Sequence, residues 1–156
     1  MTQEDRIAPS LSIGPYVSAA CFAEHVLTET DNAHSLIRII DRIQVAITAR
    51  GEMKELPKIQ HSLTLFVSLK CGGERGSHEL EIVPVKPSGE RLPSQSNPVH
   101  FEGPEYKGVN IIAKMSIEIS GEGTWWFEIR HRKQLLTKIP LNVIFQIQTR
   151  KPASPT

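Results

Sequence analysis

The sequence predicts an all-β fold, and three observations support that prediction. Apolar and polar residues alternate at period two along several segments, mainly in the second half of the chain. Segments rich in glycine, proline or serine separate these runs, as turns separate strands. The middle and the C-terminal part show no long helical pattern. A single core suffices for 156 residues, because a domain of that length buries roughly 68–70% of its unfolded surface.

The first segment to explain is "CFAEHVLTETDNAHSLIRIIDRI", residues 21–43. Residues 19–27 could form a helix, since apolar side chains recur there at helical spacing. We favour a hairpin in which "ETDNA" is the turn and the isoleucine-rich residues 34–47 are the return arm, because β-branched residues prefer strands. With the turn centred on Asp31 and Asn32, the expected cross-strand pairs are Glu29 with His34, His25 with Arg38 and Leu27 with Leu36.

Strict alternation predicts two central strands, one within residues 62–71 and the other within 108–120. Their expected core faces carry Leu63, Leu65, Val67, Leu69 and Cys71 in the first strand, and Val109, Ile111, Ala113, Met115, Ile117 and Ile119 in the second. Residues 78–86 form a shorter strand between them. Proline and serine are frequent in residues 86–98, which we therefore expect to be an exposed crossover between two sheets.

The C-terminal strands are expected around a reversal and a turn. The two glycines of "SGEG" at 120–123 predict a tight turn and a hairpin. The arm after it would place Trp125, Phe127 and Ile129 on one face and Trp126, Glu128 and Arg130 on the other. Residues 132–133 then turn the chain into a last strand, residues 134–148, where Pro140 indicates an edge or a bulge.

Seven or eight short strands at even spacing predict a single immunoglobulin-like antiparallel β-sandwich. We assign residues 15–147 to this domain. Residues 1–14 are polar, and residues 148–156 are rich in proline, serine and threonine. Neither end supplies an apolar face, so we expect an N-terminal and a C-terminal tail.

Charge and cysteine content bear on location and partners. The 18 lysines and arginines nearly balance the 17 acidic residues, so no overall field would draw the protein to nucleic acid or to a membrane. No signal peptide or membrane-spanning segment is recognisable, which makes the cytoplasm the expected location. Cys21 and Cys71 lie in apolar runs without a CxxC pair. We expect buried thiols, with a disulfide or a reactive thiol as the alternative.

Sequence patterns that carry chemistry are few. The chain lacks GxSxG, HExxH, GxxxxGK(S/T) and GxGxxG, which removes the better-marked hydrolases, metalloproteases and nucleotide-binding classes. No cofactor is predicted. The alternative to a non-enzymatic protein is a small metal-dependent or hydrolytic enzyme that uses His25, Glu29 and His34, with Glu24 or Cys21 as a further ligand. Strand alternation, however, directs Glu24 away from His25.

Three segments of the chain resemble a known family. "CFAEHVLTETDNAHSLIRIIDRI", the strand "HSLTLFVSLKC" and the final "GEGTWWFEIRHRKQLLTKIPLNV" are similar to parts of an uncharacterised family of small bacterial β-sandwich proteins. The similarity covers roughly residues 17–146, and "TDNA" stands where the family's first turn has a glycine. The resemblance implies a bacterial β-sandwich protein and brings no activity or catalytic residue with it.

These observations favour a non-enzymatic protein-interaction or accessory module. The expected surface is the 123–133 hairpin, where Trp126 points away from the core beside Arg130, Arg132 and Lys133, or else an exposed edge strand. Covering of Trp126 by the N-terminal tail is the alternative at this face. The basic hairpin tip also suits nucleic acid, although Glu122 and Glu128 lower the local field. The partner we expect is another protein, and the oligomeric state stays open.

Overall fold

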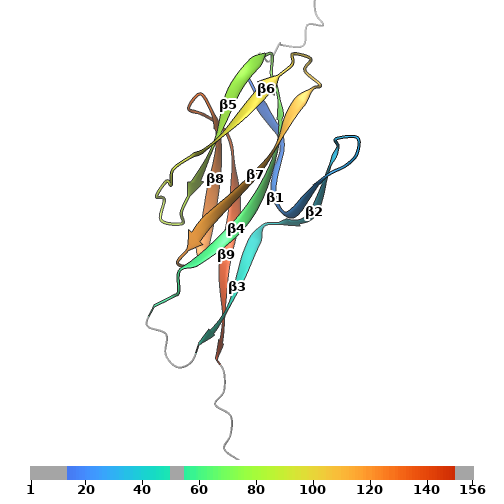
Figure 1. The fold of residues 1–156 in the computed structure, drawn as a ribbon. Coiled ribbons are helices and arrows are strands. Elements are labelled where there is room, and N and C mark those ends of the chain that lie inside the picture. The colour runs from blue at the N-terminus through green and yellow to red at the C-terminus, as the bar shows by residue number, and fades with distance from the viewer. Residues whose placement is uncertain (1–13, 50–54, 150–156) are drawn as a thin grey trace, which may run out of the picture.

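The computed structural model describes residues 14–49 and 55–149, which form nine strands and no helix. The strands are β1 (Tyr16–Thr28), β2 (His34–Ile40), β3 (Arg42–Ala49), β4 (Ile59–Lys70), β5 (Gly76–Val85), β6 (Gln95–Phe101), β7 (Gly108–Ile119), β8 (Gly123–His131) and β9 (Gln134–Thr149). They form two sheets (Figure 1). One sheet has the strand order β2-β1-β4-β7 and the other has the order β3-β9-β8-β5-β6.

Alternation along the strands builds the core between the two sheets. β4 and β7 pair antiparallel from Ile59↔Ile119 to Lys70↔Gly108. The predicted core face of β4 is buried throughout, and that of β7 is buried except for Val109 and Met115, which pack against the core from its margin. The opposing sheet contributes Trp125, Phe127, Ile129, Leu141, Val143 and Phe145, all of them buried. The period-two prediction is therefore confirmed for both sheets.

The strand order is that of an immunoglobulin-like sandwich. Immunoglobulin domains hold strands A, B and E in one sheet and strands C, F and G in the other. Here β1, β4 and β7 occupy the first set of positions, and β5, β8 and β9 occupy the second. The predicted fold class is confirmed, with two refinements. The described residues contain nine strands, and β3 runs parallel to β9 although the other pairs are antiparallel.

Two predicted connections are wrong. β7 and β8 belong to different sheets, so "SGEG" carries the chain across the sandwich and does not close a hairpin. Conversely, β5 and β6 pair antiparallel within one sheet, from Gly76↔Phe101 to Ile82↔Gln95. Residues 86–98 therefore connect two neighbouring strands and already include the start of β6. A turn-forming composition marks a reversal, but it does not say in which sheet the next strand pairs.

The stretch around residues 21–40 forms the hairpin that we favoured over a helix, in a register one residue away from the predicted one. Thr28 lies opposite His34, and Val26 lies opposite Leu36. The turn is "ETDNA", as predicted, but Glu29 lies within it and does not pair with His34. Its shape is set by the Asp31 carboxylate, which accepts a hydrogen bond from the Ala33 N–H (3.0 Å), and by Asn32, which takes a left-handed conformation (φ 66°).

The predicted return arm is two strands and not one. β2 ends at Ile40, Asp41 turns the chain, and β3 joins the other sheet beside β9. The Asp41 carbonyl accepts a hydrogen bond from the Asn142 N–H (3.0 Å), which ties this crossing to β9. Since both halves are rich in isoleucine and only Asp41 separates them, the sequence pattern reads as one arm.

The remaining predictions concern single residues and the ends of the chain. Both cysteines are free, Cys71 is buried and Cys21 is half-buried, and burial raises the pKa of the Cys21 thiol. Pro140 lies opposite Trp126, just before Asn142, where pairing with β3 begins. Pro140 therefore lies in the part of β9 that has only β8 beside it, as its missing N–H requires.

The two predicted tails fall mostly outside the described residues, namely residues 1–13 of the first and 150–156 of the second, whereas residues 148–149 belong to β9. No helix long and apolar enough to cross a membrane is present in the described part of the chain.

Candidate binding surfaces

The β1–β2 hairpin folds back over the outside of the four-stranded sheet. β1 pairs with β4 through residues 16–22, where Cys21 lies opposite Phe66. The far end of the hairpin returns to the same place, because the ring of His34 meets the Phe66 ring edge-on, with 5.8 Å between centroids. Phe66 points away from the core side of β4 and is nevertheless buried. Figure 1 shows β2 and the end of β1 as a hairpin beside the sandwich, and we attribute the cover of Phe66 to it.

The two sides of this hairpin differ in exposure. His34, Leu36 and Val26 share one side and are partly buried. The other side, which we call the outer face, consists of His25, Leu27, Ser35, Ile37 and Ile39. Leu27, Ile37 and Ile39 are 47%, 40% and 63% exposed. The outer face contains no aspartate, glutamate, lysine or arginine. It is an apolar surface, and nothing among the described residues covers it.

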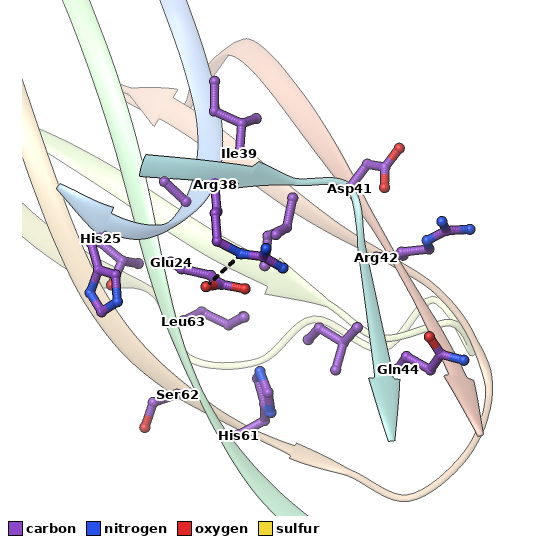
Figure 2. A pocket seen from close by; sticks show the side chains of 14 residues that line it. Glu24, His25, Arg38, Ile39, Asp41, Arg42, Gln44, His61, Ser62 and Leu63 are labelled. Carbon is purple, nitrogen blue, oxygen red and sulfur yellow. Dashed lines mark ion pairs between the residues drawn. The ribbon is translucent and has the colours of Figure 1, made fainter. Parts of the chain in front are cut away.

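A polar hollow of about 780 Å³ lies at the base of the hairpin, between the bend of β1, the β2–β3 junction and β4. Figure 2 shows Glu24 and Arg38 pointing into it and joined by an ion pair, with 2.9 Å between the Arg38 Nε and a Glu24 carboxylate oxygen. His61, Ser62 and Thr64 of β4 also line it. Ile39 projects from the opposite side of β2. Ile39 and His25 of the outer face nevertheless also line the hollow, so the charged pair and the apolar face adjoin at the base of the hairpin.

Arg38 has a backbone conformation that is uncommon for its residue type. Its φ is 54°, in the left-handed region. Pairing between β1 and β2 continues on both sides, with His25↔Ile37 and Ala23↔Ile39, but is interrupted at this residue. An irregularity of this kind on an edge strand disfavours the addition of a further strand. The predicted pairing of His25 with Arg38 is wrong, since Arg38 contacts Glu24.

The residues of the alternative enzyme hypothesis make separate contacts. His25 lines the hollow, while Glu29 and His34 do not. The Glu29 carboxylate accepts a hydrogen bond from the Ser35 hydroxyl at 2.7 Å, and the His34 Nδ1 lies 3.3 Å from the Thr28 hydroxyl. No group of three or more histidine, cysteine, aspartate or glutamate side chains that could hold a metal ion occurs within residues 14–49 and 55–149. The structure therefore does not bring this predicted set together.

Trp126 lies on the outer side of the five-stranded sheet, as alternation predicts. It is half-buried, between Val85 of β5 and Pro140 of β9 in the neighbouring strands. The Lys138 Nζ sits 4.4 Å from the centre of its ring, a cation–π contact. The indole is therefore held by its own sheet and offers only part of its surface to a partner.

The basic residues near Trp126 are paired with acids. Arg130 contacts Glu128 at 2.8 Å, and Arg132 contacts Glu74 at 3.4 Å. Glu128 is buried and also contacts Arg91 at 3.0 Å. Hydrogen bonds from Arg91 and Arg130 lower the pKa of the Glu128 carboxyl from its ordinary value of 4.5 to about 2. Arg132 and Lys133 are both exposed, but of the four residues predicted to bind only Lys133 combines exposure with the absence of an ion pair among the described residues.

A buried histidine pair, which no sequence pattern indicates, lies at the same end of the sheet. The His78 Nδ1 and the His131 Nε2 are 3.1 Å apart, and the other nitrogen of His78 lies 2.9 Å from the Arg75 carbonyl. Burial lowers the pKa of His131, and the nearby His78 and Arg132 act in the same direction. These contacts join β5, β8 and the turn before β5, so we assign the pair a structural role.

The outer face of the β1–β2 hairpin was missed as a surface, although the sequence contains its signal. "LIRII" at 36–40 has apolar side chains at both odd and even positions. A strand with a core on one side only buries either its odd or its even positions, not both. One set had to point away from the core or meet another layer. In the structure, Leu36 and Ile40 take the inner positions, and Ile37 and Ile39 are exposed.

An immunoglobulin-like β-sandwich with an added edge hairpin is thus the class that this structure defines. Residues 18–144 match a family of unknown function, DUF6941, and the chain belongs to that family. This confirms the resemblance to an uncharacterised β-sandwich family. No curated protein matches the chain. Among solved structures, the chain is similar to an immunoglobulin-like protein from Pseudomonas aeruginosa, at 12% identity and a TM-score of 0.41, over 83% of this chain and 96% of that one.

Proposed function

We propose that this protein is a non-enzymatic interaction module that binds another protein through the outer face of the β1–β2 hairpin. One observation supports the proposal above all. Three large aliphatic side chains, Leu27, Ile37 and Ile39, are 40% to 63% exposed on a face that carries no charged residue. Contiguous apolar surface of this kind is characteristic of contact sites, whereas apolar residues that are exposed singly need no explanation.

The 123–133 hairpin is the second surface to consider, and its geometry favours it less. Trp126 is held by Lys138, and the two arginines that would attract a partner are bound to Glu128 and Glu74. A partner would have to replace these contacts. The same ion pairs count against nucleic-acid binding at this tip, because a phosphate would compete with carboxylates already in place. The separate contacts of His25, Glu29 and His34 add no support to an enzymatic function.

The proposal is tested by affinity purification of the tagged full chain from its native cells, followed by mass spectrometry. Four forms are compared: the wild type, Ile39→Lys, Trp126→Ala and Ile147→Lys. Ile147 is a matched control, since it is also an isoleucine on a strand, is 54% exposed and lies away from the hairpin. We expect a protein that is recovered with the wild type, with Trp126→Ala and with Ile147→Lys, and that is lost with Ile39→Lys.

Two outcomes would contradict the proposal. Loss of the recovered protein in Trp126→Ala together with its retention in Ile39→Lys would move the binding surface to the 123–133 hairpin. Recovery of the same proteins by all four forms would show that neither surface binds.

A further inference from the structure

We infer that His78 and His131 form an acid-sensitive latch, which holds the turn before β5 to the end of β8 and opens when both imidazoles become positively charged. His78 lies near the start of β5, and His131 is the last residue of β8. The latch is therefore part of the five-stranded sheet. The inference is independent of the binding proposal for the β1–β2 hairpin.

The two rings lie at the margin of the core. The side chain of His78 is 5% exposed, and His131 is 7% exposed. The Phe101 ring of β6 packs against the His78 ring, with 5.4 Å between centroids. Water has little access to either imidazole, so each must find its hydrogen-bond partners within the protein.

The contacts of His78 determine where the protons are. Its Nε2 lies 2.9 Å from the Arg75 carbonyl oxygen, which can only accept, so this nitrogen carries a hydrogen. In a neutral ring the other nitrogen, Nδ1, is then an acceptor. The facing nitrogens of the two rings are 3.1 Å apart, and the hydrogen between them must therefore belong to the Nε2 of His131.

This hydrogen bond tolerates one positive charge in the pair and not two. With a single extra proton, one of the two facing nitrogens can remain an acceptor. When both imidazoles are protonated, all four ring nitrogens carry hydrogens. Two N–H groups then face each other at 3.1 Å, and two like charges meet where water is largely excluded. That state breaks the hydrogen bond between β5 and β8.

The charged groups around the pair can balance one positive charge. A Glu74 carboxylate oxygen lies 3.8 Å from the Nε2 of His78. Burial, His78 and Arg132 lower the pKa of the His131 imidazole, whereas Glu74 raises it. The residues opposite the two rings on neighbouring strands are uncharged and are Leu80, Val99 and Gln134.

Acid opens the latch through proton linkage. In the unfolded chain both imidazoles take a proton near a pH of about 6.5, whereas the closed latch holds at most one of these two protons. The unfolded state then binds more protons than the folded state, so stability is highest above this pH and falls as the pH drops below it. Opening also loosens the turn before β5, which carries the Glu74 that binds Arg132.

The test compares the wild type with His131→Gln and His100→Gln by urea denaturation between pH 7.5 and pH 5. The amide N–H of glutamine can replace the Nε2–H of His131, and glutamine does not titrate. His100 is the matched control, an exposed histidine of β6. Glu128 is common to all three forms, so its titration cancels in the comparison.

We expect the unfolding equilibrium constant of the wild type to rise relative to that of His131→Gln. The rise should reach up to about tenfold for each pH unit below about 6.5, which corresponds to one proton. His100→Gln should parallel the wild type. Parallel pH dependence of the wild type and His131→Gln would overturn the inference.

NMR of the imidazole nitrogens tests the same inference on the wild type, without a substitution. At pH 7.5 both His78 and His131 should carry their hydrogen on Nε2. As the second ring becomes protonated, exchange of the amides of residues 74–78, corrected for the intrinsic effect of pH, should accelerate. A different tautomer of either ring, or two protonated rings without faster exchange, would also overturn the inference.

Discussion

At the scale of single residues, Glu128 shows how far a local pattern reaches. Alternation places it on the outer side of β8, next to Trp126, and predicts that it weakens the basic field of the hairpin tip. The structure adds Arg91, which lies 37 positions earlier in the chain and binds the same carboxylate. No local pattern contains that contact. It depends on the connection between β5 and β6, which composition alone assigns to a crossover between sheets.

The Glu128 carboxylate should make stability depend on acid. Its pKa falls from 4.5 in the unfolded chain to about 2 in the folded one. The folded state therefore gains from this group above pH 4.5, and the gain is lost as the pH falls toward 2. We expect Glu128→Gln to lower the free energy of unfolding at neutral pH by about 1.5–3 kcal/mol, the contribution of hydrogen bonds to charged groups. Urea denaturation at pH 7, 4.5 and 3 measures the effect.

The matched control is Glu105→Gln, the same change on an exposed loop residue. The difference in stability between wild type and Glu128→Gln should shrink as the pH is lowered, and that between wild type and Glu105→Gln should stay small. A constant penalty for Glu128→Gln from pH 7 to pH 3 would mean that the charge of Glu128 is not what stabilises the fold.

At the scale of elements, the turn between β8 and β9 combines a correct prediction with an unfavourable sequence. Arg132 and Lys133 form the turn, as expected, and both have positive φ, 46° and 65°. Two successive left-handed residues are the geometry of a type I′ turn, for which Asn-Gly is the preferred sequence. We expect the double variant Arg132→Asn, Lys133→Gly to be more stable than wild type by about 1 kcal/mol, because a non-glycine residue in the left-handed region costs on the order of 1 kcal/mol or more; urea denaturation measures the change.

The same variant also separates the two candidate binding surfaces. It removes Arg132 and Lys133, two of the four predicted binding residues. The ion pair between Arg132 and Glu74, which this variant also removes, is exposed and contributes little to stability. Partner recovery should be unchanged if the β1–β2 hairpin is the surface. A variant that gains stability and loses the partner would assign binding to the 123–133 hairpin.

The strands and their faces were predictable because burial acts on every second residue, as in β4 and β7. The register of the β1–β2 hairpin was not, because it depends on how Asp31 and Asn32 shape the turn. The exposed face of that hairpin was only half visible in the sequence. "LIRII" required a second apolar surface, but the backbone had to be known to tell that Leu36 is covered and that Ile37 and Ile39 are not.

At the scale of the whole molecule, the two layers follow from the sequence and the path between them does not. Both halves of residues 34–47 read as one strand, yet the chain changes sheets at Asp41. It changes sheets again at "SGEG", where the glycines predict a hairpin. These choices are made by packing between segments that are distant in sequence. Contacts that join the two sheets are therefore the ones that test the fold.

The contact between Phe22 of β1 and Phe127 of β8 is such a test. Their rings meet edge-on across the sandwich, with 4.8 Å between centroids. We expect Phe22→Leu and Phe127→Leu each to cost about 0.5–3 kcal/mol. Since either change alone already abolishes the interaction between the rings, their effects should differ from additivity by about 0.5–1.5 kcal/mol, the range measured for aromatic pairs.

Urea denaturation of the two single variants and the double variant measures this coupling. Phe22→Leu combined with Phe145→Leu is the control, because no ring contact between Phe22 and Phe145 is present in the described structure, and these effects should add. Additivity in both cycles would mean that β1 does not face β8. Because the β1–β2 hairpin owes its position to β1, the same result would also remove the structural basis for an outer face on which the binding proposal depends.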